Sequence, residues 1–437
     1  MSLPVSACRP AAPALHALRM HLHAQHQAIV VMRTDCHVCR AEGLAPNSRV
    51  LVRAGERQVV ALLYQTESTL FASDQVVLSE AAWDALGVAD GDTVQVSHPP
   101  LLESLALVRK RIYGKRLDGQ ELTAIIRDVV DGQYSDVDLS AFLTTSATLP
   151  LDADETVALT RAMVEAGTRL SWPAPIVVDK HCVGGLPGNR TSPIVVAIAT
   201  ANGLVMPKTS SRAITSPAGT ADTMETMAPV NLDLATLRRV VETEGGCLAW
   251  GGSMHLSPAD DILIRVQRPL DFDSDGQLVA SVLSKKIAAG STHVLIDMPV
   301  GPTAKVRGEA AAHSLGTRLA HTAGALGLQL GIHRSDGTQP VGRGIGPALE
   351  AHDVLKVLRN AADAPADLRE RALALSAALL DMAAGSNAGT GLERARGVLD
   401  SGAALAKFLA ICEAQGGFRE PPRAAFTADV PAPASGR

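Results

Sequence analysis

The stretch Asp179-Lys-His-Cys-Val-Gly-Gly-Leu-Pro-Gly-Asn-Arg-Thr-Ser192 decides the fold of this chain. The apolar run Ile176–Val178 that leads into it predicts a buried strand. Ser192 is a typical helix N-cap, Pro193 suits the first helical position, and Asn202-Gly203 closes the apolar segment that follows. The sequence therefore predicts a strand, a glycine-rich loop and a helix in that order.

This loop is predicted to bind an anion, most simply phosphate. Backbone N–H groups beside a helix N-terminus favour negative charge, although the helix dipole contributes only about 0.3–1 kcal/mol. Lys180 adds a full positive charge. The common nucleotide motif Gly-x4-Gly-Lys-Ser/Thr does not fit, because Asn189 and Arg190 stand five residues after Gly184 and Gly185. A tight turn that uses glycine only for its geometry is the alternative.

Composition indicates a soluble cytoplasmic protein of about three domains. The chain has 437 residues, 46% of them hydrophobic, and a net charge of −5, so nothing attracts it to nucleic acid or to an anionic membrane surface. Only 3% of the residues are aromatic, which argues against a base-stacking platform. No apolar run approaches the length of a membrane span. The six cysteines do not suggest a disulfide framework in a chain of this length.

The N-terminal part is predicted to be a mobile extension followed by a β-rich, barrel-like domain. Residues 1–24 are rich in Ala, Pro and His without periodicity. From 25 to 98, short β-like runs alternate with Gly- and Asp-containing turns, and one helix is expected at Glu80–Leu86. The expected strands are Ile29–Met32, Val50–Val52, Val59–Tyr64, Val76–Leu78 and Thr93–Val96.

The larger part is predicted to combine an all-helical lobe with an α/β domain. Residues 100–170 and 255–288 have helical patterns, and Asp152-Ala-Asp-Glu155 is a capping box. In 171–254 and 289–340 strands alternate with helices, which predicts a central, mostly parallel sheet covered by helices. Residues 341–419 are expected to mix helices with short strands, and 420–437 to form a mobile tail.

Cys36-His-Val-Cys39 is a Cys-x-x-Cys motif within the β-rich region. A structural zinc site usually needs a second such pair, which the scattered remaining cysteines do not supply. A redox pair is not favoured either, because the sequence context is not that of a strand-to-helix turn in a βαβ unit. No metal site is expected.

A second polar loop, Pro207–Asp222, follows the expected strand Leu204–Met206. It carries more hydroxyl groups than a plain turn needs, although a solvated loop is the simpler interpretation. Together the two loops resemble the thymidine phosphorylase superfamily. The resemblance rests on Asp179–Gly185, Ser210-Ser-Arg212, Gly219-Thr220, Ser257–Asp260, Ala280–Lys286, Gln339–Gly342 and Gly346–Glu350, and it covers about 100–415.

Within that superfamily the chain looks closer to the AMP phosphorylase branch. The segments Pro187–Thr191, Ser211–Ser216, Ala218–Asp222 and Trp250–Gly252 match it, and that branch also carries an extra N-terminal β domain. Three positions depart from thymidine phosphorylase. Ile262 stands where that enzyme has a pyrimidine-contacting arginine, Pro299–Lys305 replaces its glycine-rich loop, and Cys182 replaces a phosphate-binding serine. A thiol is a weak donor.

The resemblance implies a pentosyltransferase that cleaves an N-glycosidic bond with phosphate, without a cofactor. It implies Asp273 as proton donor and His181 beside the base. The phosphate candidates are Lys180, Cys182, Gly184, Gly185, Ser192, Ser210 and Thr220. The nucleotide or base candidates are Gly185, Ser211, Arg212, Ala213, Ile214, Thr215, Ser216, Thr220, Ser281, Lys285 and Lys305.

Four functions stay open at this point. The first is phosphorolysis of a nucleoside 5′-monophosphate (AMP, CMP or UMP) to base and ribose 1,5-bisphosphate. The second is phosphorolysis of thymidine or uridine. A phosphoribosyltransferase of the anthranilate type would share the fold, but we find no paired acidic motif placed for its Mg²⁺. A non-catalytic nucleotide-binding protein is the fourth. The family implies a homodimer or a larger homo-oligomer.

Overall fold

The computed structural model describes residues 14–24, 27–213, 218–254, 256–272, 274–385 and 389–434. Ile214, Thr215, Ser216 and Asp273, all named above as site candidates, lie outside these residues. The chain divides into two compact units, one formed by Met1–Tyr113 with Arg127–Phe142, the other by Gly114–Ile126 with Leu143–Arg437. Each unit is described by itself.

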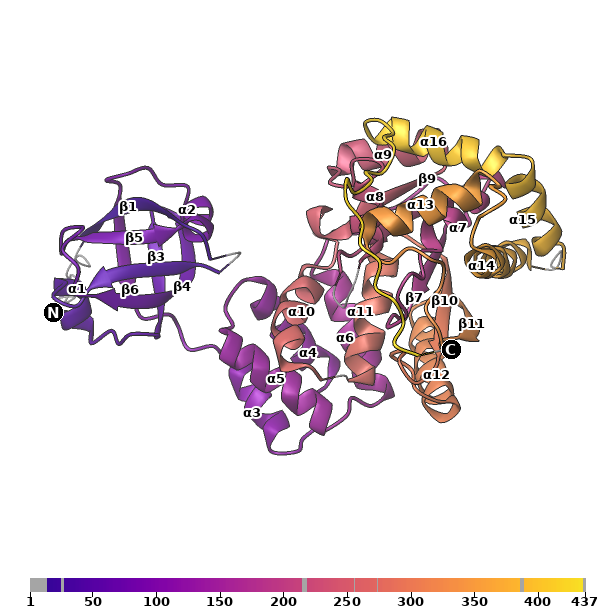
Figure 1. Cartoon of the computed structure of the whole chain (residues 1–437). Coiled ribbons are helices and arrows are strands. Elements are labelled where there is room, and N and C mark those ends of the chain that lie inside the picture. Colours follow the sequence, from indigo (N-terminus) through magenta and orange to yellow (C-terminus); the bar gives the residue numbers. More distant parts are fainter. Residues whose placement is uncertain are drawn as a thin grey trace, which may run out of the picture. The chain divides into compact units, whose positions relative to one another are not determined.

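The first unit contains a closed six-stranded barrel (Figure 1). Neighbouring strands follow the order β1-β5-β2-β4-β3-β6. Strands β1 and β6 begin with alternating exposed and buried residues, and the inward side chains of the barrel, among them Leu15, Val30 and Leu63, form one core. The bounds are β1 Ala14–Leu22, β2 Ile29–Arg33, β3 Arg49–Ala54, β4 Arg57–Thr66, β5 Gln75–Ser79 and β6 Thr93–Ser97. The predicted barrel-like domain is confirmed.

The first strand corrects the expectation of a mobile extension through residue 24. Ala14–Leu22 pairs with β5 in parallel and with β6 in antiparallel orientation. Its inward positions Leu15 and Ala17 are buried, while the intervening residues are not. The strand escaped the sequence analysis because only two small or medium apolar residues face the core. The backbone pairing, which the composition does not reveal, fixes it.

Five helices begin in the described residues up to Phe142. They are α1 His37–Glu42, α2 Glu80–Leu86, α3 Ser104–Ile112, α4 Gly119–Val130 and α5 Asp136–Thr148. The predicted helix α2 is confirmed with its bounds. Ser79 caps it, because its side-chain oxygen accepts a hydrogen bond from the backbone N–H of Ala82.

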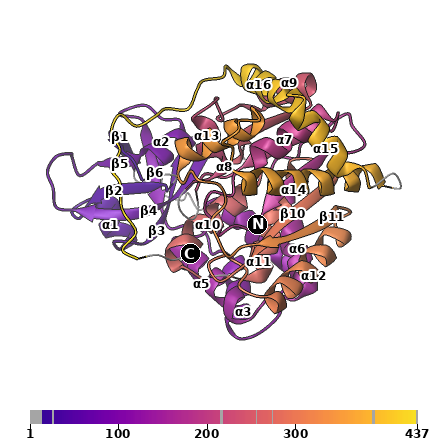
Figure 2. The ribbon, with the colours of Figure 1, turned by 45° about the vertical axis from the view of Figure 1, so that its right-hand side comes forward.

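The second unit is built on parallel strands (Figure 2). One sheet has the order β11-β10-β7, and β8 pairs with β9. A single parallel bridge between Val177 and Val205 links the two sheets within the described residues. The bounds are β7 Val178–Cys182, β8 Met206–Ser210, β9 Gly246–Trp250, β10 His293–Val300 and β11 Gln329–Asp336. The predicted parallel sheet is confirmed.

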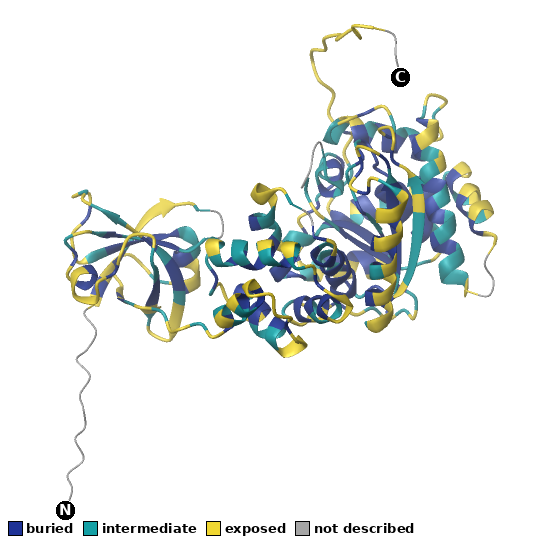
Figure 3. Cartoon of the chain, turned by 90° about the horizontal axis from the view of Figure 1, so that it is seen from below, coloured by how far each residue is buried: buried dark blue, intermediate teal, exposed yellow. Residues whose placement is uncertain are grey.

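Helices cover both faces of the three-stranded sheet. Leu295 of β10 packs into a core formed with α7 (Ser192–Ala201) and α14 (Ala366–Ala384), whereas Val294 and Ile296 pack into a core with α11 (Asp275–Ala288) and α12 (Glu309–Ala325). Strand β10 is buried along most of its length, whereas the edge strand β11 is half-exposed, and Figure 3 colours the whole chain by burial. The helices of this unit are α6 Ala153–Glu165, α7 Ser192–Ala201, α8 Thr220–Glu225, α9 Leu234–Glu244, α10 Pro258–Leu270, α11 Asp275–Ala288 and α12 Glu309–Ala325, with a short 3-10 turn at Gly251–Met254.

Two local expectations at helix starts meet different outcomes. The capping box of α6 is confirmed, since Asp152 and Glu155 each accept a hydrogen bond from the other's backbone N–H. The expected N-cap Ser192 is wrong by one residue, because Thr191 occupies the N-cap position of α7, without a side-chain capping hydrogen bond, and Ser192 is the first helical residue. The start of a helix is the least certain feature of a sequence pattern.

The C-terminal part corrects a second expectation. Between 341 and 419, the described residues form helices and no strand. The helices are α13 Pro347–Leu358, α14 Ala366–Ala384, α15 Gly391–Asp400 and α16 Ala403–Gln415. Short apolar runs there belong to helices that are buried on one side, such as α14, whose Leu368, Leu375 and Leu379 are buried.

Candidate phosphate-binding site

Strand β7 carries the first charged residues of the candidate site. The sequence predicted a strand that ends at Val178 and a loop from Asp179, but the strand runs from Val178 to Cys182. Four residues of the expected loop are therefore strand residues. The polar side chains concealed the strand, because burial of charge is not visible in a hydrophobicity pattern.

This register separates the four side chains onto two faces of the sheet. Successive strand residues point to opposite faces. Lys180 is paired in register with Leu295, on the side of α7 and α14, and His181 with Ile296, on the side of α11 and α12. Lys180 and Cys182 thus share one face, and Asp179 and His181 share the other.

On the α11 side, two buried lysines share one aspartate. Lys208 Nζ lies 3.2 Å from Asp179 Oδ1, and Lys286 Nζ lies 2.7 Å from Asp179 Oδ2. Both ammonium groups also donate to the carbonyl oxygen of Thr209, at 3.0 and 3.3 Å. All three charged side chains are at most 4% exposed. The group carries two positive charges and one negative charge when both lysines are protonated.

The pKa values of this group reflect the crowding. Burial opposes ionisation of Asp179, but the charges of Lys208 and Lys286 outweigh it and lower the pKa of that carboxyl. Burial lowers the pKa of Lys208 to about 7; the Asp179 carboxylate opposes this shift, and the charge of Lys286 adds to it. Lys208 therefore changes charge near neutral pH, and a bound anion would favour its protonated form.

On the α7 side, a lysine and an arginine share a second aspartate. Lys180 Nζ lies 3.4 Å from Asp297 Oδ2 and donates to Thr191 Oγ1 at 2.7 Å. A guanidinium nitrogen of Arg371 lies 3.6 Å from Asp297 Oδ1. Burial opposes ionisation of Asp297, but Lys180 and Arg371 outweigh it and lower its pKa. Here too, two cations face one carboxylate.

Cys182 lies at the end of β7, beside this second group. Asn189 bridges the two, because its side-chain amide donates to Asp297 Oδ2 at 3.0 Å and to the Cys182 sulfur at 3.3 Å. Burial and the Asp297 carboxylate raise the pKa of the Cys182 thiol to about 11. Cys182 is therefore a neutral thiol and adds no negative charge to the site.

His181 is neutral at physiological pH. Burial lowers its pKa well below the ordinary value, and the charges of Lys286, Lys208, Lys285 and Lys180 lower it further. A neutral imidazole can donate a hydrogen bond from one ring nitrogen and accept one at the other. Four lysines therefore act on this one side chain.

The glycine-rich loop joins β7 to α7 in a conformation that glycine favours. Gly184, Gly185 and Gly188 have φ values of 104°, 81° and 72°. A Cβ atom on Gly185 would lie 2.5 Å from the backbone nitrogen of Lys305, and one on Gly188 would lie 2.0 Å from the carbonyl oxygen of Val341. The glycines thus permit close backbone contacts that bring Lys305 to the loop.

The second loop is held to the first by Arg190. Its guanidinium donates to Thr220 Oγ1 at 2.9 Å and to the Ala218 carbonyl at 2.7 Å, and it pairs with Glu350 of α13 at 2.6 Å. Arg212, predicted as a nucleotide contact, instead pairs with Glu225 at 2.6 Å and lies 4.9 Å from the centre of the Trp250 ring. Arg212 therefore stabilises the loop in this structure.

The α10–α11 side of the unit brings two predicted base contacts together. Lys285 Nζ donates to Ser281 Oγ at 3.2 Å and to Asp260 Oδ2 at 2.7 Å. Asp260 is buried and fixes the lysine. An ammonium and a hydroxyl side by side can both donate to the oxygen atoms of a base or a sugar.

The remaining predicted residues are placed as follows. Ser210 ends β8, and its hydroxyl donates to the Ala249 carbonyl at 3.3 Å. Ser192 is buried at the start of α7. Ser211 is exposed, and Ala213 donates its backbone N–H to Asp222 at 2.7 Å. No direct contact between Lys180 and either serine hydroxyl, Ser192 or Ser210, is present in the described part of the chain.

Sequence reasoning missed Lys208 and Lys286, two of the most buried charges. Lys286 could have been found, because it continues the buried stripe Val279, Val282 and Leu283 of α11 at helical spacing, whereas Lys285 does not. Lys208 lies in β8, which pairs with β9. No spacing of apolar residues around it indicates that its side chain is buried.

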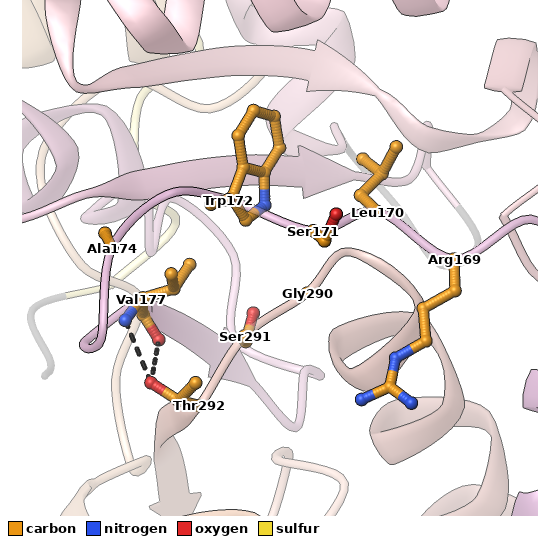
Figure 4. A pocket seen from close by; sticks show the side chains of 9 residues that line it. All are labelled: Arg169, Leu170, Ser171, Trp172, Ala174, Val177, Gly290, Ser291 and Thr292. Carbon is orange, nitrogen blue, oxygen red and sulfur yellow. Dashed lines mark hydrogen bonds between the residues drawn. The ribbon is translucent and has the colours of Figure 1, made fainter.

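A pocket of about 340 Å³ lies elsewhere in the second unit (Figure 4). Val177, just before β7, and Thr292, just before β10, line it together with Trp172 and Arg169. The Thr292 hydroxyl bonds to both backbone groups of Val177, at 2.9 and 3.1 Å. These residues precede the strands, whereas Lys180 and His181 lie towards the carboxyl end of β7. The pocket is thus distinct from the candidate site.

Comparisons with known proteins agree with this architecture. Residues 105–167 match the helical bundle domain of a glycosyl transferase family, and residues 174–405 match its a/b domain. Proteins of Parvibaculum lavamentivorans and Tolumonas auensis, both named “Putative thymidine phosphorylase”, are 66% identical over 428 residues, which cover 98% of this chain and 85% of each relative.

A solved structure supports the fold alone. Anthranilate phosphoribosyltransferase of Thermus thermophilus superposes with a TM-score of 0.60 at 20% identity, over 70% of this chain and 98% of that one. Among the described residues, no helix is long and apolar enough to cross a membrane.

Proposed function

The chain belongs to glycosyl transferase family 3, the thymidine phosphorylase family, and on this basis we propose that it phosphorolyses nucleoside 5′-monophosphates. Membership makes it a pentosyltransferase, a nucleoside or nucleotide phosphorylase. The proposed reaction converts AMP, CMP or UMP and inorganic phosphate to the free base and ribose 1,5-bisphosphate.

One observation carries the proposal of a phosphate site. On each face of β7, two cationic side chains share a single aspartate: Lys208 and Lys286 on Asp179, Lys180 and Arg371 on Asp297. Burying uncompensated charge costs several kcal/mol. An oxyanion that enters beside these groups would remove that cost, and the neutral Cys182 and His181 would not repel it.

The proposed chemistry places phosphate beneath C1′ of the sugar. A phosphate oxygen forms a bond to C1′ as the bond from C1′ to the base nitrogen breaks with its electron pair. The sugar becomes oxocarbenium-like between these events, and the phosphate anion stabilises the developing positive charge. Lys180 and the loop at Gly184–Gly185 are proposed to hold the phosphate against this position.

The departing base needs a proton or a strong hydrogen bond. A general acid contributes about 10²–10⁴-fold. By the resemblance noted above, we assign that role to Asp273. His181, kept neutral by burial and by the surrounding lysines, is proposed to donate a hydrogen bond to the base rather than a proton. Ser281 and Lys285 are proposed to contact the same part of the substrate.

Two features favour a nucleotide over a nucleoside. Ile262 cannot donate to a base carbonyl, so a pyrimidine contact of thymidine phosphorylase is absent at this position. Lys305 is brought to the glycine loop by its backbone, whose N–H donates to the Gly184 carbonyl at 3.5 Å. A 5′-phosphate adds negative charge to the substrate, and another cation near the loop would serve it.

A second candidate is phosphorolysis of thymidine or uridine. The name of the relatives at 66% identity favours it. So do Ser281 and Lys285, which present adjacent O–H and N–H donors suited to the carbonyl groups of a pyrimidine. UMP and uridine differ only in the 5′-phosphate, so this pair separates the two candidates most cleanly.

Release of free base from AMP, CMP, UMP, uridine and thymidine, with and without phosphate, tests the proposal. We expect phosphate-dependent release from at least one monophosphate at a kcat/KM well above that of its nucleoside. Lys180→Met and Asp273→Asn should each reduce it, and Lys356→Met, at an exposed ion pair with Asp363, should not. Turnover of nucleosides alone would establish the second candidate. Nucleotide binding without base release would contradict both.

A further inference from the structure

Cys36 and Cys39 lie one helical turn apart in the first unit. The backbone N–H of Arg40 bonds to the Cys36 carbonyl at 3.1 Å, which begins α1 directly after Cys36. Residues three apart in an α-helix have Cα atoms about 5 Å apart. Disulfides form at Cα separations of about 4.4–6.8 Å. Both cysteines lie on this one turn, so no large backbone movement separates them from a disulfide, and the Cys39 thiol here donates to the Met32 sulfur at 3.9 Å.

The setting differs from that expected from the sequence. Strand β2 ends at Arg33, and α1 begins at His37, so the motif occupies a strand-to-helix turn. Cys36 is the N-cap residue of α1, and no side chain supplies a capping hydrogen bond there. A strand-to-helix turn is therefore present, although it belongs to the barrel and not to a βαβ unit, since β2 pairs with β5 and β4 and not with the following strand β3.

The two thiols are chemically unequal. The nearby Cys39 thiol and the backbone N–H groups at the start of α1 lower the pKa of Cys36 to about 6, against the opposing effect of burial. The nearby Cys36 thiol and burial raise the pKa of Cys39. A thiolate is the nucleophile in disulfide exchange, so Cys36 is the attacking group and Cys39 the resolving one.

We propose that Cys36 and Cys39 form a reversible intramolecular disulfide by exchange with a low-molecular-weight disulfide, which makes the barrel unit a site of redox modification. The Cys36 thiolate attacks one sulfur of the small disulfide, whose S–S bond breaks and releases one thiolate. Cys39 then loses its proton and attacks the Cys36 sulfur, releasing the second small thiol. Two protein thiols are oxidised and one small disulfide is reduced to two thiols.

Local opening of α1 gives the reagent access. Cys36 and Cys39 are 0% and 4% exposed, so the closed form protects them. Helix α1 has only six residues, and apart from Cys39 only Val38 of the helix is buried. Short helices with few buried contacts open at low free-energy cost. Exchange is therefore expected to be slower than for a free thiol but complete.

A single tryptic peptide reports the reaction. Cleavage after Arg33 and Arg40 releases Thr34–Arg40, which contains both cysteines and no other. The full-length protein is incubated with oxidised glutathione, blocked with N-ethylmaleimide and digested. We expect this peptide to appear unalkylated and two hydrogen atoms lighter than the dithiol, and dithiothreitol to restore double alkylation. Cys247 and Cys412, whose pKa values burial raises to about 12, should stay alkylatable after unfolding.

Two single variants test the assigned order of attack. Cys39→Ser should accumulate a glutathione adduct on Cys36, because no resolving thiol is left. Cys36→Ser should take up glutathione on Cys39 at least tenfold more slowly, since that thiol has the raised pKa. Circular dichroism and the calorimetric transition of the barrel unit check that both variants fold.

Three results would overturn the proposal. The first is a peptide that stays doubly alkylated under conditions that oxidise the same chain unfolded in urea. The second is equal adduct formation on the two single variants. The third is a disulfide that joins two chains instead of Cys36 to Cys39.

Discussion

Lys180 is the side chain that we propose to hold the phosphate. It is buried in β7, and its ammonium lies between Asp297 and the Thr191 hydroxyl. In Lys180→Met, Asp297 keeps Arg371 as a partner, so we expect the fold to persist. Loss of one preorganised oxyanion contact costs about 10²–10³-fold. We therefore predict that kcat/KM for phosphate falls by about this factor. Initial rates at varied phosphate check it, with Lys356→Met as the control.

Lys208 predicts a pH dependence of anion binding. Its pKa is lowered to about 7, so above that pH it loses its proton and the cluster loses one positive charge. Affinity for an anion must then fall with rising pH, by up to about tenfold per unit for one coupled proton. Sulfate is the suitable probe, because it does not titrate between pH 6 and 9. The Kd of sulfate, measured directly by isothermal titration calorimetry, should rise over this range.

Lys208→Met supplies the matched control for that dependence. His181 has a pKa well below its ordinary value, so it adds no charge change in this range. The variant should therefore bind sulfate more weakly than the wild type at pH 6 and show a flat profile above it. A profile as steep as that of the wild type would assign the titration to another group.

Some site residues could be predicted from the sequence and others could not. Lys180, His181, Ser281 and Lys285 could be named because they stand in a recognisable order along the chain. Which of two adjacent lysines faces inwards depends on helix phase, and Lys286, not Lys285, reaches Asp179. The pairing of Lys208 with Asp179 joins β8 to β7, and no local pattern contains that contact. Asp273 stays a prediction that rests on resemblance.

At the scale of elements, the loop between β7 and α7 depends on backbone contacts. Gly188 has a φ of 72°, and a Cβ there would lie 2.0 Å from the Val341 carbonyl oxygen. Gly203, after α7, has a φ of 83° with open space around it. Gly203→Ala should cost about 1 kcal/mol for the left-handed conformation alone.

Gly188→Ala should lower the free energy of unfolding by the same ~1 kcal/mol for its left-handed conformation, and by about a further 1–3 kcal/mol for the clash with Val341. It should also raise KM for phosphate, because the loop must move. Thermal denaturation and initial rates of the two variants check this. Equal destabilisation by the two substitutions would mean that the loop does not require the close contact with Val341.

Elements that bury polar residues, or bury few apolar ones, are those that the sequence did not predict. The end of strand β7 was predicted too early, at Val178, because Asp179 and Lys180 are 0% exposed despite their charge. Strand β1 was not expected because its core residues are only Leu15 and Ala17. Helix α2 and the capping box of α6, by contrast, were predicted from the local sequence pattern alone. Tertiary pairing decides the others.

At the scale of the whole molecule, two compact units have separate hydrophobic cores. We predict two calorimetric transitions, since each core can melt on its own. Sulfate should raise only the transition temperature of the unit that contains Lys180. At a sulfate concentration of 100 times its Kd, the free energy of unfolding of that unit should rise by about 2.7 kcal/mol. Leu63→Ala, in the barrel core, should lower only the other transition, with a cost of about 2–5 kcal/mol. One transition that responds to both changes would contradict separate units.

The most direct test of the central claim is anomalous diffraction from a crystal soaked in arsenate, a phosphate analogue whose arsenic scatters anomalously. We predict one strong anomalous peak within hydrogen-bonding reach of Lys180 or of the Gly184–Gly185 amides, and its loss in Lys180→Met. A peak elsewhere, or none in a crystal whose loop is open to solvent, would contradict the assignment of this loop to phosphate.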